Sequence, residues 1–415
     1  MGVASPFFRS LPLAQYGFHW IEPELPLAHP LKDGTAVALH PRLPQMASEF
    51  SPHDFAAWSR LFQPLIDQWP SLVPEILSPV LHLPRHPLAL ARFGIPALLP
   101  ATTLARTLFR DPRAHALFAG CAAHSVMPLD SPLSAAVGLV LATAGHRAGW
   151  PVIRGGSQSL TEALAAHLRS LGGELITGHQ VTSLADLPPA ALTLFDTSVQ
   201  SLSRIAGPRL TPAYLQSLTT FRPGPGVFKV DWALSEPIPW QADSCRRAAT
   251  IHVGGTLPQI AAAERTAFSS THSETPFVLL VQPSIADPSR APAGRHTAWG
   301  YCHVPNSSTL DRTQAIESQI ERFAPGFRDC ILARRTQTTV QLEAWNANLT
   351  GGDISGGAMT PRQLILRPTR RTYATSDPAI FLCSSSTPPG GGVHGMCGFH
   401  AATLALQSLK SRRPT

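Results

Sequence analysis

SSSTPPGGGVHGMCGFHAA, residues 384–402, follows the apolar run IFLC and leads into a helical pattern. Consecutive glycines let backbone amides approach a ligand closely, because no Cβ stands in the way. The helix predicted to begin near Met396 would direct its unpaired amides and positive dipole end at the same place. We therefore expect an electron-rich group to bind at Gly390, Gly391, Gly392, Val393, His394, Gly395 and Met396. A loop that only connects strand to helix is the alternative that this pattern leaves open.

A second glycine-containing segment lies upstream, at residues 152–184. Its pattern predicts a glycine turn, a long amphipathic helix, a stop at Gly172 and Gly173, and then a β-rich stretch. Leucines at i, i+4, i+8 and i+11 predict one buried helical face, formed by Leu160, Leu164, Leu168 and Leu171. Residues 191–197 resemble another buried strand, so the segment suits an α/β layer.

The remaining pattern alternates between sheet and helix. Residues 18–39 predict a small sheet with a hairpin turn at Lys32 to Gly34. Helical spacing follows up to about residue 147, with Ser51 as the first N-cap. Strands that suggest one antiparallel sheet are expected at 226–234, 276–282 and 296–304, a helix at 311–323 and a last strand at 380–386.

Composition describes a globular chain with little charge. Of its 415 residues 44% are hydrophobic and only 14% charged, and Lys and Arg exceed Asp and Glu by 33 to 26. Because the basic residues are scattered, we expect no nucleic-acid partner. Six cysteines without a CxxC pair favour reduced thiols and a cytoplasmic location. No signal peptide or membrane-spanning segment is predicted.

Several segments resemble one family of flavoproteins. Residues 384–402 are similar to the C-terminal flavin-binding signature of phytoene-desaturase-like FAD-dependent oxidoreductases, in the branch of the pyridine nucleotide-disulfide oxidoreductase domain-containing proteins. Further segments agree with that family in the same order along nearly the whole chain. They are ASPFFRSLPL, PLAHPLKDG, GCAAHSVMPL, RGGSQSLTEALAAHLRSLGGELITGHQV, GPGVFKVDWALSEPIPW, ATIHVGGTLPQIAAAE, AWGYCHVPN, IERFAPGFRD and GGDISGGA.

The resemblance implies a fold and a set of flavin-binding residues. The fold would be α/β, with an incomplete FAD-binding Rossmann-like domain interleaved with an α+β substrate domain, as in amine oxidases. The implied division is a substrate-domain sheet at 1–50, its helical part at 51–149, FAD-domain segments at 150–220 and 371–415, and further substrate domain at 221–370. Residues from Gly390 to Met396 would hold the isoalloxazine end of FAD. Gly155, Gly156 and Ser157 would line the central cavity, and Val181, in a strand, would contact adenine through its backbone.

One departure concerns the phosphate-binding motif. Such proteins bind the FAD pyrophosphate at a GxGxxG turn between a strand and a helix. This sequence contains no GxGxxG, and it begins at a point that the family reaches only after that unit. A misplaced start, a gene fragment and a true loss are all compatible with this. We expect FAD binding by this chain to be weak or absent.

Histidines and an aspartate are further candidates. His394 and His303 suit the flavin neighbourhood, where an imidazole could donate to a carbonyl or relay a proton, although a structural hydrogen bond is the commoner role. Asp231 could stand at a cavity wall or simply in a strand ladder. The pairs His82 with His86 and Cys121 with His124 lack a second pair at metal-binding spacing, so no metal is expected.

Together these features predict an FAD-dependent oxidoreductase that transfers a hydride from an apolar, unsaturated or lipid-like substrate to flavin. The alternative is a cofactor-free remnant that acts as a binding or interaction protein. A proline-rich apolar face suggests peripheral membrane contact in addition. The catalytic acid or base, the substrate, the electron acceptor and the oligomeric state are not predicted.

Overall fold

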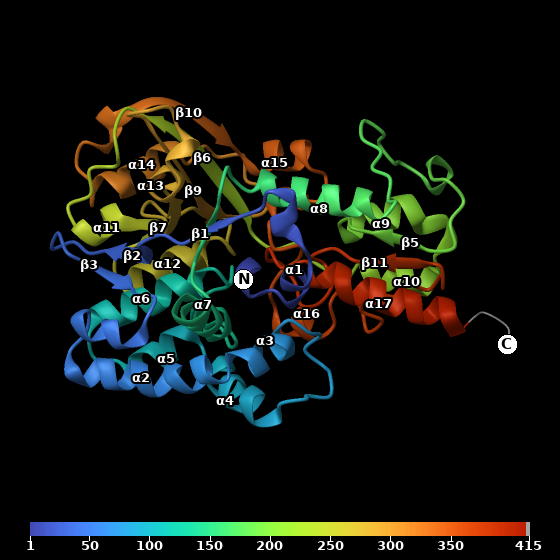
Figure 1. The fold of residues 1–415 in the computed structure, drawn as a ribbon, viewed down its shortest axis with the longest axis horizontal. Coiled ribbons are helices and arrows are strands. Elements are labelled where there is room, and N and C mark those ends of the chain that lie inside the picture. The colour runs from blue at the N-terminus through green and yellow to red at the C-terminus, as the bar shows by residue number, and fades with distance from the viewer. Residues whose placement is uncertain (412–415) are drawn as a thin grey trace.

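A mixed seven-stranded sheet organises the larger part of the molecule (Figure 1). The computed structural model describes residues 1–411. The strand order is β10-β6-β9-β8-β7-β2-β3. In chain order these strands are β2 (Leu25–Pro30), β3 (Ala36–Leu39), β6 (Gly226–Leu234), β7 (Ala248–Val253), β8 (Val278–Val281), β9 (His296–Val304) and β10 (Ile331–Gln337).

The predicted antiparallel strands are confirmed as the neighbours β6, β9 and β8. The hairpin is confirmed too, because β2 and β3 pair antiparallel around a turn in which the amide of Leu31 donates to the carbonyl of Thr35. The expected separate small sheet is wrong. Strand β2 also pairs in parallel with β7, so the hairpin completes the large sheet.

Helices cover both faces of this sheet. Ser51 caps the first helix as predicted, since its side chain accepts a hydrogen bond from the amide of Asp54. The layer below the sheet in Figure 1 is helical and shares a large apolar core with it. It contains α2 (Pro52–Asp67), α3 (Trp69–Ile76), α4 (Pro87–Ala97), α5 (Ala101–Leu108), α6 (Pro112–Ala123), α7 (Ala135–Arg147) and, nearer the sheet, α12 (Leu257–Thr266). The opposite face packs against α11 (Asp243–Arg247), α13 (Pro283–Ala286) and α14 (Thr313–Glu321).

A smaller α/β unit lies beside the sheet, at the right of Figure 1. Its two strands, β5 (Thr193–Phe195) and β11 (Ile380–Leu382), pair in parallel. Around them lie α8 (Gln158–Ser170), α9 (Val199–Ala206), α10 (Pro212–Leu218) and α17 (Met396–Ser411). The remaining short elements are α1 (Pro6–Ser10), β1 (Trp20–Ile21), β4 (Val152–Ile153), α15 (Thr339–Trp345) and α16 (Pro361–Ile365).

Two expectations about residues 158–183 are wrong. Leu160 is buried on α8, but Leu168 is 41% exposed and Leu171 is 72% exposed, so the predicted apolar face is buried only at its N-terminal end. Residues 174–183 form no strand, and Val181 lies in an irregular, mostly exposed segment. A strand needs a neighbouring ladder for its amides, and β5 pairs with β11 alone among the described strands.

No single helix within residues 1–411 has both the length and the apolar composition of a membrane span. The pair α4 and α5 meets those two criteria only when joined, across a bend of 94°.

Candidate functional site

The glycine-rich turn predicted from the sequence joins β11 to α17, and α17 begins at Met396 as expected. Gly390, Gly392 and Gly395 have φ values of +105°, +139° and +66°, which side-chain-bearing residues rarely adopt. The turn is exposed at residues 391–393. Within residues 1–411, no hydrogen bond is made by the amides of Gly391, Gly392, Val393, Gly395, Cys397 and Gly398. The turn therefore presents unpaired donors at the positive end of a helix.

One buried arginine holds this turn in place. Arg367 is 1% exposed, and its guanidinium donates to the carbonyl of Ser385 at 2.9 and 3.0 Å and to that of Ser355 at 2.8 Å. Ser385 precedes the turn, and Ser355 lies directly against Gly391. Burial lowers the pKa of Arg367 to about 10, so its guanidinium stays charged at neutral pH. No sequence pattern distinguishes this arginine from the others.

The segment GGDISGG wraps around the carboxylate of Asp353. That carboxylate accepts hydrogen bonds from the amides of Gly224, Ser355 and Gly357 at 2.6–2.7 Å. Because Ser355 is also bound by Arg367, the loop and the turn form one hydrogen-bonded support. The glycines of the segment have positive φ values, from +61° to +132°, which explains why glycine occurs there. The helix that follows, α16, is only five residues long and is capped by Thr360.

The N-terminal residues lie against the turn. The hydroxyl of Ser5 donates to the carbonyl of His394 at 2.6 Å, and a Cβ added at Gly2 would lie 3.2 Å from the carbonyl oxygen of Val393. Ser5 also caps α1 by accepting from the amide of Phe8. These contacts join the N-terminal residues to residues 393 and 394 of the turn.

His394 has a structural hydrogen bond, the role considered commoner from the sequence. Its Nδ1 accepts a hydrogen bond from the amide of Met396 at 3.0 Å, which satisfies the first amide of α17. Burial lowers the pKa of His394 to about 4, so the ring is neutral at pH 7. Protonation would turn Nδ1 into a donor and break this cap.

The second predicted glycine segment follows β4. Gly155 and Gly156 have φ values of +74° and +105°, and the amide of Gly155 donates to the carboxylate of Asp287 at 2.7 Å. Ser157 is exposed at the start of α8. The segment is linked to the turn through a short series of contacts, because β4 pairs with Trp20, Trp20 packs on Gly2, and Gly2 lies beside Val393. Its role in lining a cavity stays a prediction.

Buried imidazoles form a polar cluster between the sheet and the helical layer. Nδ1 of His303 lies 2.7 Å from the carboxylate of Glu264, and Nε2 of His303 has no partner within residues 1–411. Nε2 of His124 lies 2.9 Å from Nε2 of His252. Burial, then the charges of His303 and the Met1 amine, lower the pKa of His124 to about 3. The Met1 amine also acts on His394, so the cluster and the turn share one neighbourhood.

A partly exposed aromatic wall continues this face of the sheet. The rings of Trp299 and Tyr301 on β9 stack with centroids 6.3 Å apart and planes 8° apart. The ammonium of Lys229 lies 5.7 Å from the centre of the Trp299 ring and pairs with Asp231 on the same strand. Asp231 also stands opposite Trp299 in the ladder, so it has a strand-ladder position and an ion-pair partner.

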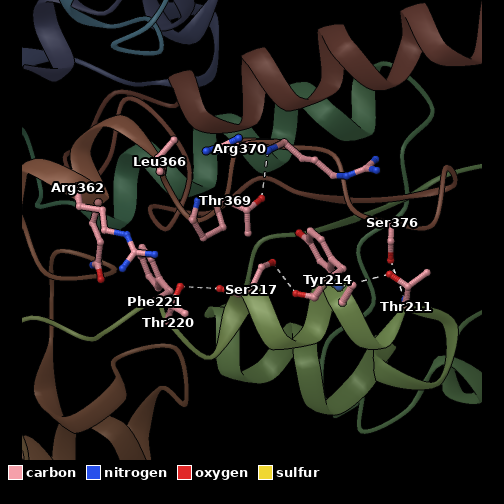
Figure 2. A pocket seen from close by; sticks show the side chains of 14 residues that line it. Thr211, Tyr214, Ser217, Thr220, Phe221, Arg362, Leu366, Thr369, Arg370 and Ser376 are labelled. Atoms are coloured by element: carbon pink, nitrogen blue, oxygen red, sulfur yellow. Dashed lines mark hydrogen bonds between the residues drawn. The ribbon is translucent and has the colours of Figure 1, made fainter.

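A separate cavity lies between α10 and the segment from residue 362 to residue 376 (Figure 2). Its volume is about 430 Å³. Leu366 and Pro368 line it, whereas Arg367 between them reaches back to the turn. The sequence reading assigned nothing to this pocket.

No protein-family model matches the chain. Curated relatives do. The chain is 27% identical over 310 residues to pyridine nucleotide-disulfide oxidoreductase domain-containing protein 2 of Mus musculus, a match that covers 64% of this chain and 53% of the relative. It is 28% identical over 306 residues to an uncharacterized protein of Mycobacterium tuberculosis, with 64% and 56% covered. The chain thus spans about half the length of the curated relatives it matches.

Solved structures agree over almost the whole chain. An oxidoreductase from Methanosarcina mazei superposes with a TM-score of 0.59 at 13% identity, covering 98% of this chain and 85% of that one. Putrescine oxidase bound to putrescine superposes with a TM-score of 0.59 at 14% sequence identity, and the match covers 98% of this chain and 86% of that one. Cyclohexylamine oxidase from Brevibacterium oxydans superposes with a TM-score of 0.52 at 13% sequence identity, and the match covers 96% of this chain and 84% of that one.

The chain therefore has the fold that is found in putrescine oxidase and cyclohexylamine oxidase. The predicted α/β class is therefore confirmed, as is the resemblance to the pyridine nucleotide-disulfide oxidoreductase domain-containing proteins. The structure places a strand, a glycine turn and a helix at residues 380–411, where the sequence predicted them. The closer likeness to phytoene desaturases stays a prediction.

The residues at the turn fit a flavin ring. Six amides without partners within residues 1–411 and a helix N-terminus offer donors to an electron-rich edge, and the turn is exposed at residues 391–393. The carboxylate of Asp353, which belongs to this support, already accepts from three amides.

Proposed function

We propose that this chain acts as an FAD-dependent oxidoreductase on an apolar small molecule. The observation that carries the proposal is the exposed glycine turn with its unpaired amides at the start of α17. The chain's resemblance to FAD-dependent oxidoreductases supports it. A flavin bound at this turn would supply the redox chemistry, the acceptance of a hydride from an unsaturated or lipid-like substrate.

The residues of the chain bind and orient the reactants. The unpaired amides of residues 391–393, 395, 397 and 398 would stabilise negative charge on a flavin bound at the turn, and Arg367 keeps the turn in position. The stacked rings of Trp299 and Tyr301 supply an apolar wall that suits a substrate with little charge. Val181 lies outside any strand, and its backbone would make the proposed contact with adenine.

The chain should distinguish poorly between FMN and FAD. Because this sequence has a turn for the ring but no GxGxxG for the pyrophosphate, we expect weak binding in which FMN and FAD differ by less than about tenfold, or 1.4 kcal/mol. Quenching of flavin fluorescence during titration with the purified chain would measure both affinities. FAD that binds at least a hundredfold more tightly than FMN would show that the chain grips the ADP half. No quenching by either flavin would favour the cofactor-free remnant.

A matched pair of glycine variants tests where the ring binds. Gly392→Ala places a methyl group on the exposed turn at φ +139°, so we expect flavin affinity to fall about tenfold. Gly172→Ala at the end of α8 is strained in the same way, at φ +83°, but meets no atom within 4 Å. It should cost about 1 kcal/mol of stability and leave flavin affinity unchanged. Equal affinities for the two variants would place the ring elsewhere.

We also propose peripheral membrane contact through α4 and the segment before it. Leu83 is 93% exposed, and Leu88 and Ile95 are 76% and 71% exposed on one side of α4. The exposed apolar residues of this membrane face are Val80, Leu81, Leu83, Leu88, Ile95 and Leu98. No Asp or Glu occurs from residue 76 to residue 110, whereas Arg85 and Arg92 are exposed there. Apolar area with cations beside it suits an anionic lipid surface.

The segment before α4 is held in one shape by a buried carboxylate. Glu75 accepts hydrogen bonds from the amides of Arg85 and His86, each at 2.9 Å, and from Nε2 of His82 at 2.5 Å. Leu83 therefore projects from an ordered loop.

Flotation with vesicles of phosphatidylcholine and phosphatidylglycerol tests this contact. We expect the wild-type chain to float. The double variant Leu83→Ser, Leu88→Ser should lose at least about tenfold in vesicle affinity, because burying each leucine side chain contributes about 1.5–3 kcal/mol. Leu332→Ser, on β10 and 57% exposed, is the matched control and should float like the wild type. A wild-type chain that stays at the bottom of the gradient would contradict the proposal.

A further inference from the structure

The pocket beside α10 carries positive charge without any acidic side chain. Arg362, Arg370 and Arg371 line it, and its lining contains no Asp or Glu. Figure 2 shows Arg362 at one end of the pocket and Arg370 above it, on the same side as Thr369. The carboxylate of Asp377, close by in the chain, is bound by Arg209 at 2.6 Å. Three cations around one cavity repel each other, and a bound anion would relieve that repulsion.

Two of these guanidinium groups are free to bind a ligand. Within residues 1–411, the side chains of Arg362 and Arg370 make no hydrogen bond and no ion pair, and that of Arg371 donates only to the carbonyl of Thr375, at 3.3 Å. All three arginines are exposed. A planar guanidinium binds phosphate through two parallel hydrogen bonds, which is why arginine suits this anion.

The interior of the pocket is aromatic and hydroxyl-rich. Phe221 and Tyr214 line it with rings that are each only 6% exposed. The hydroxyl-bearing residues are Thr211, Ser217, Thr220, Thr369 and Ser376. A volume of about 430 Å³ lies in the range of small-molecule sites. Ser217 and Thr220 already donate to the carbonyls of Tyr214 and Ser217, whereas the hydroxyls of Thr211 and Ser376 only accept from backbone amides within residues 1–411. Such a lining offers a stacking surface for a ring and two hydroxyl donors for a polar linker.

We propose that this pocket binds an aromatic phosphate monoester. The phosphate lies among Arg362, Arg370 and Arg371, and the ring packs toward Tyr214 and Phe221. The site is separate from the glycine turn, although Arg367 stacks on Phe221 with 5.6 Å between guanidinium and ring centre, so the two places share that wall. The proposal does not depend on flavin binding.

Calorimetric titration with adenosine monophosphate and with adenosine tests the proposal, because the two probes share the ring and differ by the phosphate. We expect adenosine monophosphate to bind at least about tenfold more tightly than adenosine to the wild-type chain. Arg362→Gln and Arg371→Gln should each weaken adenosine monophosphate by about tenfold and leave adenosine unchanged. Inorganic phosphate should compete with adenosine monophosphate.

Arg60→Gln is the matched control, since Arg60 is also exposed but lies on α2. It should leave both affinities unchanged. The substituted arginines are exposed, so all three variants should melt close to the wild type, and a melting scan verifies that they are folded. Equal affinities for the two probes, or arginine variants that bind adenosine monophosphate as the wild type does, would overturn the proposal.

Discussion

Lowering the pH from 7 to 5 should remove at least about 6 kcal/mol from the free energy of unfolding, because several buried imidazoles are held neutral and three of them alone account for that loss. Burial lowers the pKa values of His29, His146 and His394 from 6.5 to about 4 in the folded chain. Unfolding restores the ordinary pKa, so the unfolded chain binds more protons between these values. Stability is fully present above pH 6.5 and is lost as the pH falls toward 4, at about 2 kcal/mol per histidine by pH 5.

The structural reason is that each ring either accepts a hydrogen bond at a nitrogen lone pair or has no acceptor for a second proton. Nε2 of His146 accepts from the indole of Trp58 at 3.0 Å, and Nδ1 of His394 accepts from Met396. His29 is fully buried, and its Nδ1 has no partner within residues 1–411. A total stability of 5–15 kcal/mol is ordinary for a domain, so a loss of this size brings the chain close to unfolding at pH 5.

Urea unfolding at pH 7, 6 and 5 measures this loss. His146→Gln removes one titrating ring and should reduce the pH-dependent part by about 2 kcal/mol, although the variant is less stable at pH 7. His19→Gln changes an exposed histidine and should leave the pH dependence as it is. A wild-type unfolding free energy that is the same at pH 5 and pH 7 would refute the assignment of these rings as neutral.

Local rules predicted the site better than they predicted its surroundings. The turn at residues 390–396 and the start of α17 follow from glycine runs and helix-start chemistry, which act within a few residues. Ser51 as a cap and the ladder of β6 with β9 follow in the same way. These features need no knowledge of distant neighbours.

Features that depend on distant partners were missed. A strand at Val181 has the right composition but no ladder beside it, and Leu171 has helical spacing but no surface to cover it. The pocket beside α10 joins segments about 150 residues apart in the chain. In RPTRR, at residues 367–371, nothing in the sequence separates the buried Arg367 from the exposed Arg370 and Arg371. Only packing distinguishes them.

Replacing that buried arginine by methionine should cost about 3–5 kcal/mol of unfolding free energy. Arg367→Met keeps much of the volume but removes the donors to the carbonyls of Ser355 and Ser385, which then lie buried without partners. It also removes the positive charge near Asp353, whose own charge favours the protonated guanidinium. Because these two carbonyls belong to segments that contact the glycine turn, the amides of the turn lose their fixed spacing in the variant. Flavin affinity should therefore fall at least about tenfold, in addition to the loss of stability.

Arg362→Met separates this effect from the loss of any arginine. Arg362 is exposed five residues earlier and has no hydrogen-bond partner within residues 1–411, so its replacement should change the unfolding free energy by less than about 0.5 kcal/mol. Urea unfolding of both variants, followed by flavin titration of each under folding conditions, measures the two consequences separately. If Arg367→Met unfolds at the wild-type urea concentration, the arginine does not hold the turn, and the preorganisation of its amides must come from the contacts of Ser5 and Asp353 instead.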